Sequence, residues 1–178
     1  MDNVAPYLSH RVAEIRQVGL DHIMRYDGKP YLWGGDDPVG GFDCSGLVCE
    51  YCKSMGILPR KERLTANGLY WYFQQQYPEV CSHINGAKEL PPWGECGDLV
   101  FFFWKPDWTT EQRISHVEIC LNNYQTIGAS GGGSDCIDAQ VAIDKNAFIK
   151  VRPLRVSNVV AYVRVYDIIM DKWFSKEK

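Results

Sequence analysis

One stretch of the sequence decides the fold, because a glycine-rich segment there runs directly into an apolar helical pattern: Gly34-Gly35-Asp36-Asp37-Pro38-Val39-Gly40-Gly41-Phe42-Asp43-Cys44-Ser45-Gly46-Leu47-Val48. Glycine and proline favour a loop over 34–41. The apolar residues that follow have helical spacing up to Gly56, which predicts a helix over about 44–55. Asp43 suits the N-cap of this helix, so Cys44 stands on its first turn.

Other segments also have apolar residues at helical spacing. The pattern over residues 4–25 predicts a long helix. The turn-forming residues Gly28 and Pro30 follow it and prevent the helix from continuing. Residues 64–77 predict an aromatic helix, and residues 139–148 predict a short one.

The second half of the chain predicts mostly strands. Residues 82–97 and 104–114 are expected to be connections. Helices that precede strands favour an α+β fold, with helices packed on an antiparallel sheet. The predicted strands cover residues 98–104, 116–121, 125–130, 149–154 and 159–166.

Composition limits the class of protein. The 178 residues, 46% hydrophobic and 23% charged, suit one compact domain over residues 1–178. A net charge of −3 argues against nucleic acid as the partner. The longest apolar run, 99–104, is too short to cross a membrane. Because no secretory signal is visible and seven cysteines leave a thiol unpaired, we expect synthesis in a reducing compartment.

Cys44 and His116 are the best candidate pair of nucleophile and base. A thiol at a helix N-terminus meets unpaired amides and the positive end of the helix dipole, which favour the thiolate. His116 opens a predicted core strand, which would hold a base rigidly. His10 and His22 fall on the first helix, where a surface or interhelix role is expected, and His83 falls in a predicted loop.

Several motifs, taken in order, resemble those of the NlpC-type cell-wall endopeptidases, a branch of the papain-like cysteine peptidases. The resemblance runs from about residue 20 to residue 130, and residues 137–178 are expected to complete the sheet and end in a polar tail over 172–178. The motifs are Tyr31-Leu32-Trp33-Gly34-Gly35, Phe42-Asp43-Cys44-Ser45-Gly46-Leu47-Val48, Gly56-Ile57-Leu58-Pro59-Arg60, Gly97-Asp98-Leu99-Val100-Phe101-Phe102 and His116-Val117-Glu118-Ile119.

The resemblance implies a papain-like fold and cleavage of peptidoglycan stem peptides, typically between D-glutamate, through its γ-carboxyl, and the diamino acid. It implies that Cys44 attacks the carbonyl carbon and His116 activates the thiol. Tyr31 and the Cys44 amide would hold the oxyanion. No cofactor or metal is expected. Asp43 and Ser45 would help bind a free amine of the stem peptide, and Trp33 would also contact the substrate. Without the resemblance, these residues have ordinary explanations: Asp43 is an N-cap, and Tyr31 and Trp33 are aromatic residues at a strand edge.

The chain departs from the family pattern after His116. A polar residue that orients the imidazole usually follows about twelve residues later, where this sequence has Gly128, and Glu118 replaces a usual glycine. Apolar alternation predicts a three-residue turn over 122–124 that sets Glu118 opposite Gly128. His116 and Glu118 then share a face, roughly 6–7 Å apart along the strand. We expect Glu118 to replace the missing group; a Cys–His dyad, Ser130 or a backbone carbonyl are the alternatives.

Two other motifs have ordinary explanations. Cys49 and Cys52 form a Cys-x-x-Cys but lie inside a predicted helix, so small apolar packing is favoured over zinc. The glycines 131–133 lack the following Lys-Ser/Thr of a phosphate-binding loop, and a loop at the cleft rim is expected.

Residues 128–134 and 146–153 resemble bacteriophage-encoded members of this family. That resemblance implies synthesis in the host cytoplasm and delivery to the wall by lysis or on a virion tail, with tail proteins as possible partners. Two rival interpretations stay open: a tail component that keeps the fold without activity, and a papain-like amidase or acyltransferase that acts on another amide.

Overall fold

The computed structural model describes residues 4–83, 95–103 and 114–175. A six-stranded antiparallel sheet forms its centre, in the order β3-β8-β4-β5-β6-β7. A separate two-stranded ribbon, β1 with β2, lies in the glycine-rich loop. The strands are β1 (Asp36–Asp37), β2 (Gly41–Phe42), β3 (Cys81–His83), β4 (Leu99–Phe102), β5 (His116–Asn122), β6 (Gln125–Ser130), β7 (Phe148–Pro153) and β8 (Val159–Val163).

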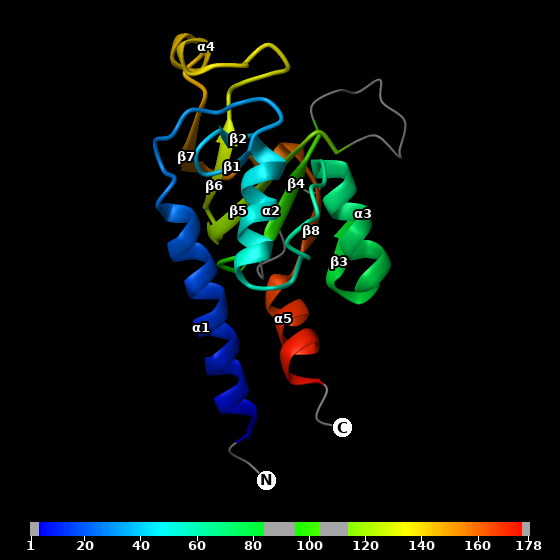
Figure 1. Cartoon of the computed structure of the whole chain (residues 1–178). Helices are drawn as coiled ribbons and strands as arrows, with labels where there is room; N and C mark the ends of the chain where they lie inside the picture. The colour runs from blue at the N-terminus through cyan, green and yellow to red at the C-terminus, as the bar shows by residue number, and fades with distance from the viewer. Residues whose placement is uncertain (1–3, 84–94, 104–113, 176–178) are drawn as a thin grey trace.

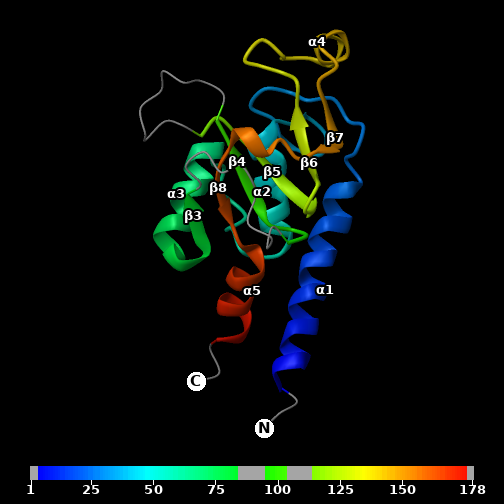
Figure 2. The ribbon, with the colours of Figure 1, turned by 180° about the vertical axis from the view of Figure 1, so that it is seen from behind.

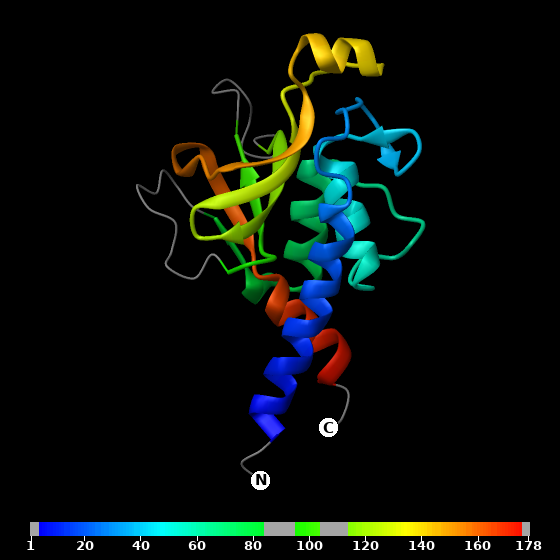
Figure 3. The same ribbon diagram turned by 90° about the vertical axis from the view of Figure 1, so that its left-hand side faces the viewer.

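Three helices cover one side of this sheet, with α2 between α1 and α3 (Figures 1, 2 and 3). The α5 helix follows β8 and contacts α1, whereas α4 stands beyond the ends of β6 and β7 (Figure 1). The described part therefore has the predicted α+β architecture, with the helix that carries Cys44 packed on the sheet. The helices are α1 (Val4–Met24), α2 (Cys44–Ser54), α3 (Ala66–Gln76), α4 (Ala139–Asp144) and α5 (Val165–Phe174), and 3₁₀ turns cover Pro78–Val80 and Val156–Asn158.

The α2 helix is central to the core. Leu47, Val48 and Tyr51 are fully buried and share one apolar cluster with Val117 and Ile119 of β5. Close approach of the glycine-rich loop fixes the start of the helix, because a Cβ at residue 46 would collide with the carbonyl oxygen of residue 35. Glycine at position 46 therefore lets the loop lie directly against the first turn of α2.

The structure confirms the predicted helices and most strands, mostly with ends that differ by one or two residues; the short helix predicted over 139–148 ends at Asp144, and Phe148 already belongs to β7. Residues 82–97 were expected to be a connection, yet Cys81–His83 pairs with β8. The remainder of that connection, residues 84–94, and residues 104–113 of the other predicted loop lie outside the described residues.

The predicted strand over 159–166 and polar tail over 172–178 are wrong at the C-terminal end. The strand stops at Val163, and α5 runs from Val165 to Phe174. Val165, Ile168 and Ile169 are fully buried at helical spacing, which explains the helix. Asp98 Oδ1 accepts a hydrogen bond from the Val165 backbone N–H at 3.0 Å, so a side chain of the preceding β4 region satisfies the helix start.

Within the described residues, no helix combines the length and the apolar character that crossing a bilayer requires.

Candidate active site

The start of α2 carries Cys44 on its first turn, directly after the N-cap Asp43. Asp43 Oδ1 accepts hydrogen bonds from the Gly46 backbone N–H at 2.7 Å and from Ser45 Oγ at 2.9 Å. Asp43 Oδ2 accepts another from the Gly34 backbone N–H at 3.1 Å. The carboxylate thus ties the glycine-rich loop to the first turn of the helix, and the predicted N-cap is confirmed.

The cysteines divide into Cys44 and six others. All seven are free, and Cys44 is half-buried on the first turn of α2. Burial raises the pKa of each of the other six thiols, in the case of Cys81 to about 12, so at neutral pH these remain thiols. The other six are Cys49, Cys52, Cys81, Cys96, Cys120 and Cys136.

His116 lies at the start of β5 and contacts the side chain of Glu118 on the same strand. Its Nε2 lies 2.7 Å from Glu118 Oε1, and both residues are buried, at 7% and 1% exposed. Thr126 Oγ1 donates to Glu118 Oε2 at 2.5 Å. A Cβ built on Gly128 would lie only 2.6 Å from Glu118 Cγ, so the Glu118 side chain occupies the space that glycine leaves.

The β5–β6 register explains this contact. Ile119 pairs with Ile127 and Cys120 with Thr126, and the same register continued sets Glu118 opposite Gly128 as predicted. The predicted three-residue turn over 122–124 is wrong, because Asn122 pairs with Gln125 and only two residues lie in the turn. A bulge between Cys120 and Asn122 absorbs the difference, so the two-residue turn does not alter the pairing near His116.

Arg152 of β7 also belongs to this cluster. Its guanidinium forms an ion pair with Glu118, its Nη2 lies 2.9 Å from His116 Nε2, and its Nη1 donates to Ser130 Oγ at 2.5 Å. Burial lowers the pKa of Arg152 to about 10, with a further contribution from Arg155, so the side chain is still cationic at neutral pH. Glu118 therefore has a compensating charge inside the sheet.

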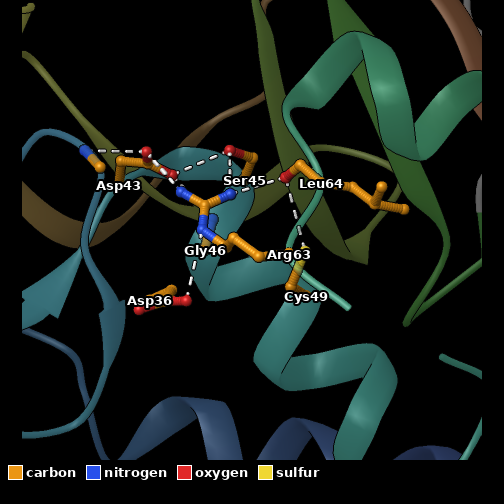
Figure 4. A network of polar contacts seen from close by, with 8 residues as sticks. Asp36, Asp43, Ser45, Gly46, Cys49, Arg63 and Leu64 are labelled. Carbon is orange, nitrogen blue, oxygen red and sulfur yellow. Dashed lines mark hydrogen bonds and ion pairs between the residues drawn. The ribbon is translucent and has the colours of Figure 1, made fainter. Parts of the chain in front are cut away.

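Arg63 makes a second cluster on the Cys44 side of the site (Figure 4). Its Nη2 donates to Asp43 Oδ2 at 2.7 Å, and its Nη1 donates to Ser45 Oγ at 3.0 Å and to the Leu64 carbonyl oxygen at 2.6 Å. Its Nε lies 3.7 Å from Asp36 Oδ2. Asp43 and Ser45 are thus brought together as expected, but an arginine of the same chain lies on both.

The two clusters face one cavity of about 1180 Å³. Cys44 and His116 both line it, and Glu118 lies behind His116 rather than in the wall. Tyr31 and Trp33 also line it; burial raises the pKa of the Tyr31 phenol, whereas the Trp33 side chain is half exposed. Further lining residues include Asp43, Ser45, Arg63, Ser130, Gly131, Gly132, Gly133, Lys150, Arg152 and Arg155.

Arg63 and Arg152 are two site residues that were not predicted from the sequence. Arg63 falls in the connection between two helices, where no periodic pattern marks it. Arg152 did carry a signal, because Ile149 and Val151 alternate with polar residues and place Arg152 on the opposite face of its strand. In the structure Thr126 of β6 pairs with Arg152 of β7. A sequence alignment of these two strands in that register would have placed Arg152 near Glu118.

The remaining histidines lie elsewhere: His22 Nε2 is 2.7 Å from Glu50 Oε1, His10 pairs with Glu14 on α1, and His83 is in β3. Across residues 4–83, 95–103 and 114–175, no three His, Cys, Asp or Glu side chains converge as a set of metal ligands.

The fold and cavity define a class of α+β proteins with a cysteine at a helix N-terminus and a histidine on an antiparallel sheet. The chain belongs to the NlpC/P60 family, whose model matches residues 28–153. This match includes both clusters and extends through β7, beyond the motifs of the sequence analysis.

Two curated relatives illustrate the membership. Murein DD-endopeptidase MepH of Escherichia coli (strain K12) is 30% identical over 125 residues, which cover 70% of this chain and 40% of that protein. The bifunctional muramidase/DL-endopeptidase CwlT of Bacillus subtilis (strain 168) is 36% identical over 116 residues, which cover 64% of this chain and 29% of that protein. The chain spans less than half the length of these relatives.

Solved structures share the fold. The peptidoglycan hydrolase RipB of Mycobacterium tuberculosis matches with a TM-score of 0.56 and 22% identity, over 88% of this chain and 67% of that one. RipD of the same organism, described as a non-catalytic domain adapted to peptidoglycan binding, matches with a TM-score of 0.53 and 20% identity, over 85% of this chain and 97% of that one. The same fold thus occurs in a hydrolase and in a non-catalytic protein.

Proposed function

We propose that this protein is a cysteine endopeptidase that cleaves an amide in the stem peptides of bacterial peptidoglycan, between D-glutamate, through its γ-carboxyl, and the diamino acid. One observation carries the proposal: Cys44 and His116 line the same cavity, and His116 is in contact with the buried carboxylate of Glu118. Family membership and the endopeptidase relatives support the substrate class.

The proposed reaction has two halves. His116 takes the thiol proton of Cys44, and the thiolate attacks the carbonyl carbon. The backbone N–H of Cys44 and the Tyr31 hydroxyl donate hydrogen bonds to the resulting oxyanion. The C–N bond then breaks, His116 gives its proton to the leaving amine, and an acyl-enzyme thioester remains. A water molecule, deprotonated by His116, hydrolyses the thioester and restores the thiol.

Glu118 acts in this scheme as the positioning residue for His116. Nε2 faces Glu118 and Arg152, so Nδ1 is the ring nitrogen assigned to the thiol. Because Nδ1 exchanges the thiol proton, Nε2 carries a proton both before and after that transfer, and in each state it donates to Glu118. Glu118 therefore serves as the acceptor for the imidazole in both protonation states that the reaction requires, and Arg152 holds the Glu118 carboxylate by an ion pair.

Substrate contacts are assigned to the residues around Cys44. The exposed indole of Trp33 provides an apolar surface at the cavity, and Asp43 and Ser45 form the polar wall next to the nucleophile. Phage or prophage origin, delivery by lysis or on a tail, and tail-protein partners rest on the sequence resemblance alone.

Digestion of defined muropeptides tests the proposal. Wild-type protein should release fragments cut inside the stem peptide, as identified by mass spectrometry, and Cys44→Ala should release none. The masses distinguish the D-γ-glutamyl bond from a D,D cross-link, and they distinguish hydrolysis from acyl transfer to an added amine. A wild type that releases nothing, with Cys44 unreactive toward iodoacetamide at neutral pH, would favour a non-catalytic role such as that of RipD or of a tail component.

A further inference from the structure

We propose that Arg63 makes the cleft select peptides whose amino end near Asp43 is acylated, and reject the matched peptides with a free amine there. This inference rests on the proposed endopeptidase function and concerns the substrate class at the same site. It reverses the expectation that Asp43 and Ser45 bind a free amine, because the guanidinium of Arg63 already lies on both (Figure 4).

The first argument is the hydrogen-bonding capacity of Asp43. A carboxylate offers about four acceptor positions, two on each oxygen. Oδ1 accepts from Ser45 Oγ and the Gly46 backbone N–H, and Oδ2 accepts from the Gly34 backbone N–H and Arg63 Nη2. An incoming ammonium group would have to displace one of these donors, and Arg63 is the one that does not belong to the cap or the loop.

The second argument is that several contacts hold Arg63 in place. Its guanidinium also donates to the Leu64 carbonyl oxygen at 2.6 Å and lies near Asp36, and the side chain is 27% exposed. Both terminal nitrogens of the planar guanidinium are used in these contacts, so little further entropy is lost when the side chain stays there, unlike a lysine on a flexible stem. The guanidinium of Arg63 is therefore a fixed part of the cavity wall.

The third argument is charge. Among the described residues that line the cavity, Asp43 is the one acidic side chain, whereas Arg63, Lys150, Arg152 and Arg155 are basic. A substrate ammonium beside Asp43 would meet the Arg63 cation at close range, in a wall with excess positive charge. An N-acylated peptide carries no charge at this point, and its amide oxygen can accept from a guanidinium N–H.

Two matched substrates test the inference: L-alanyl-γ-D-glutamyl-diamino acid with a free amino end, and the same peptide N-acetylated. We expect wild-type kcat/KM to be at least tenfold higher for the acetylated peptide. Arg63→Met should reduce this ratio at least tenfold, chiefly by improving the free-amine peptide, because it leaves Asp43 without its cation. Arg63→Gln serves if Arg63→Met does not fold, since its amide can still donate to Asp43 without a charge.

Arg60→Met is the matched control, because Arg60 is exposed and lies outside the cavity lining. It should keep the wild-type ratio. A wild type that prefers the free amine, or a ratio that is equal in wild type and both folded Arg63 variants, would overturn this inference while the proposed function stands. A wild type that cleaves neither peptide would overturn both.

Discussion

Two buried carboxylates flank the cavity, one beside the nucleophile and one beside the base, and each is paired with an arginine. Asp43 receives two of its four hydrogen bonds from backbone N–H groups of the loop and helix that it joins. Glu118 receives its contacts from side chains on three strands, namely His116, Thr126 and Arg152. The first carboxylate is thus anchored in part by the backbone, whereas the second is held by side chains alone in these contacts.

Because of this difference, we expect Asp43 to matter mainly for the stability of the site and Glu118 mainly for catalysis. Loss of charge at Asp43 leaves the cap geometry available, because asparagine also caps helices well. Loss of charge at Glu118 removes the acceptor that faces the imidazole and leaves the Arg152 cation buried without its counter-ion. We therefore expect the two sides of the cavity to respond differently to the same chemical change.

Glu118→Gln should have the largest effect. The amide keeps the shape but cannot serve as an anionic acceptor for the imidazolium, so we expect kcat to fall about a hundredfold or more. Steady-state kinetics on a defined stem peptide measures the effect. Glu50→Gln is the control, because Glu50 forms the same 2.7 Å contact with His22 away from the cavity. A turnover near wild type in Glu118→Gln would show that His116 needs no acidic partner.

Arg152→Met should reduce kcat less, by about tenfold, because Glu118 still contacts His116 but loses the charge that fixes it. Either single change leaves one charge buried without its partner, at a cost of about 3 kcal/mol in the free energy of unfolding. The double variant Glu118→Gln/Arg152→Met should recover much of that stability without recovering turnover. Urea denaturation and kinetics on the four proteins separate the two effects, and strictly additive losses of stability would contradict the pairing.

Asp43→Asn should have a smaller effect on catalysis and a modest one on stability. Asparagine retains the cap but loses the charged pair with Arg63, so we expect about 1 kcal/mol less free energy of unfolding and a kcat within about threefold of wild type. Chemical denaturation measures the first and steady-state kinetics the second. A loss of kcat as large as that of Glu118→Gln would remove the distinction between the two carboxylates.

Asp98 offers a third carboxylate, held by the Val165 and Glu95 backbone N–H groups. Burial raises its pKa from 3.8 to about 7. The protonated form is therefore favoured by folding, and its contribution to stability is present below about pH 4 and lost as the pH rises to about 7. We expect Asp98→Asn to flatten the pH dependence of the urea midpoint between about pH 4 and 7; an unchanged slope would assign that dependence to other groups.

The sequence predicted those parts of the site that depend on local pattern. The N-cap, the position of Cys44 and the helix after it follow from neighbouring residues. The contact of Glu118 with the space at Gly128 follows from apolar alternation across one short turn.

The partners from distant segments were not predicted. Arg63 reaches Asp43 only because the connection after α2 folds back, and Arg152 reaches Glu118 across two strand pairings and the long segment 131–147. The β3 strand and the α5 helix were missed for a similar reason: three residues are too few to show alternation, and the apolar residues of α5 continue directly from β8.

The contact between His116 and Glu118 is made within a single strand, two positions apart. Sliding or separation of neighbouring strands would therefore leave it unchanged, whereas a partner on β6 would move away. In evolutionary terms, such an arrangement needs only a glutamate two positions after the histidine and a glycine opposite it. An acidic partner can thus be relocated by point mutations, without any rebuilding of the sheet.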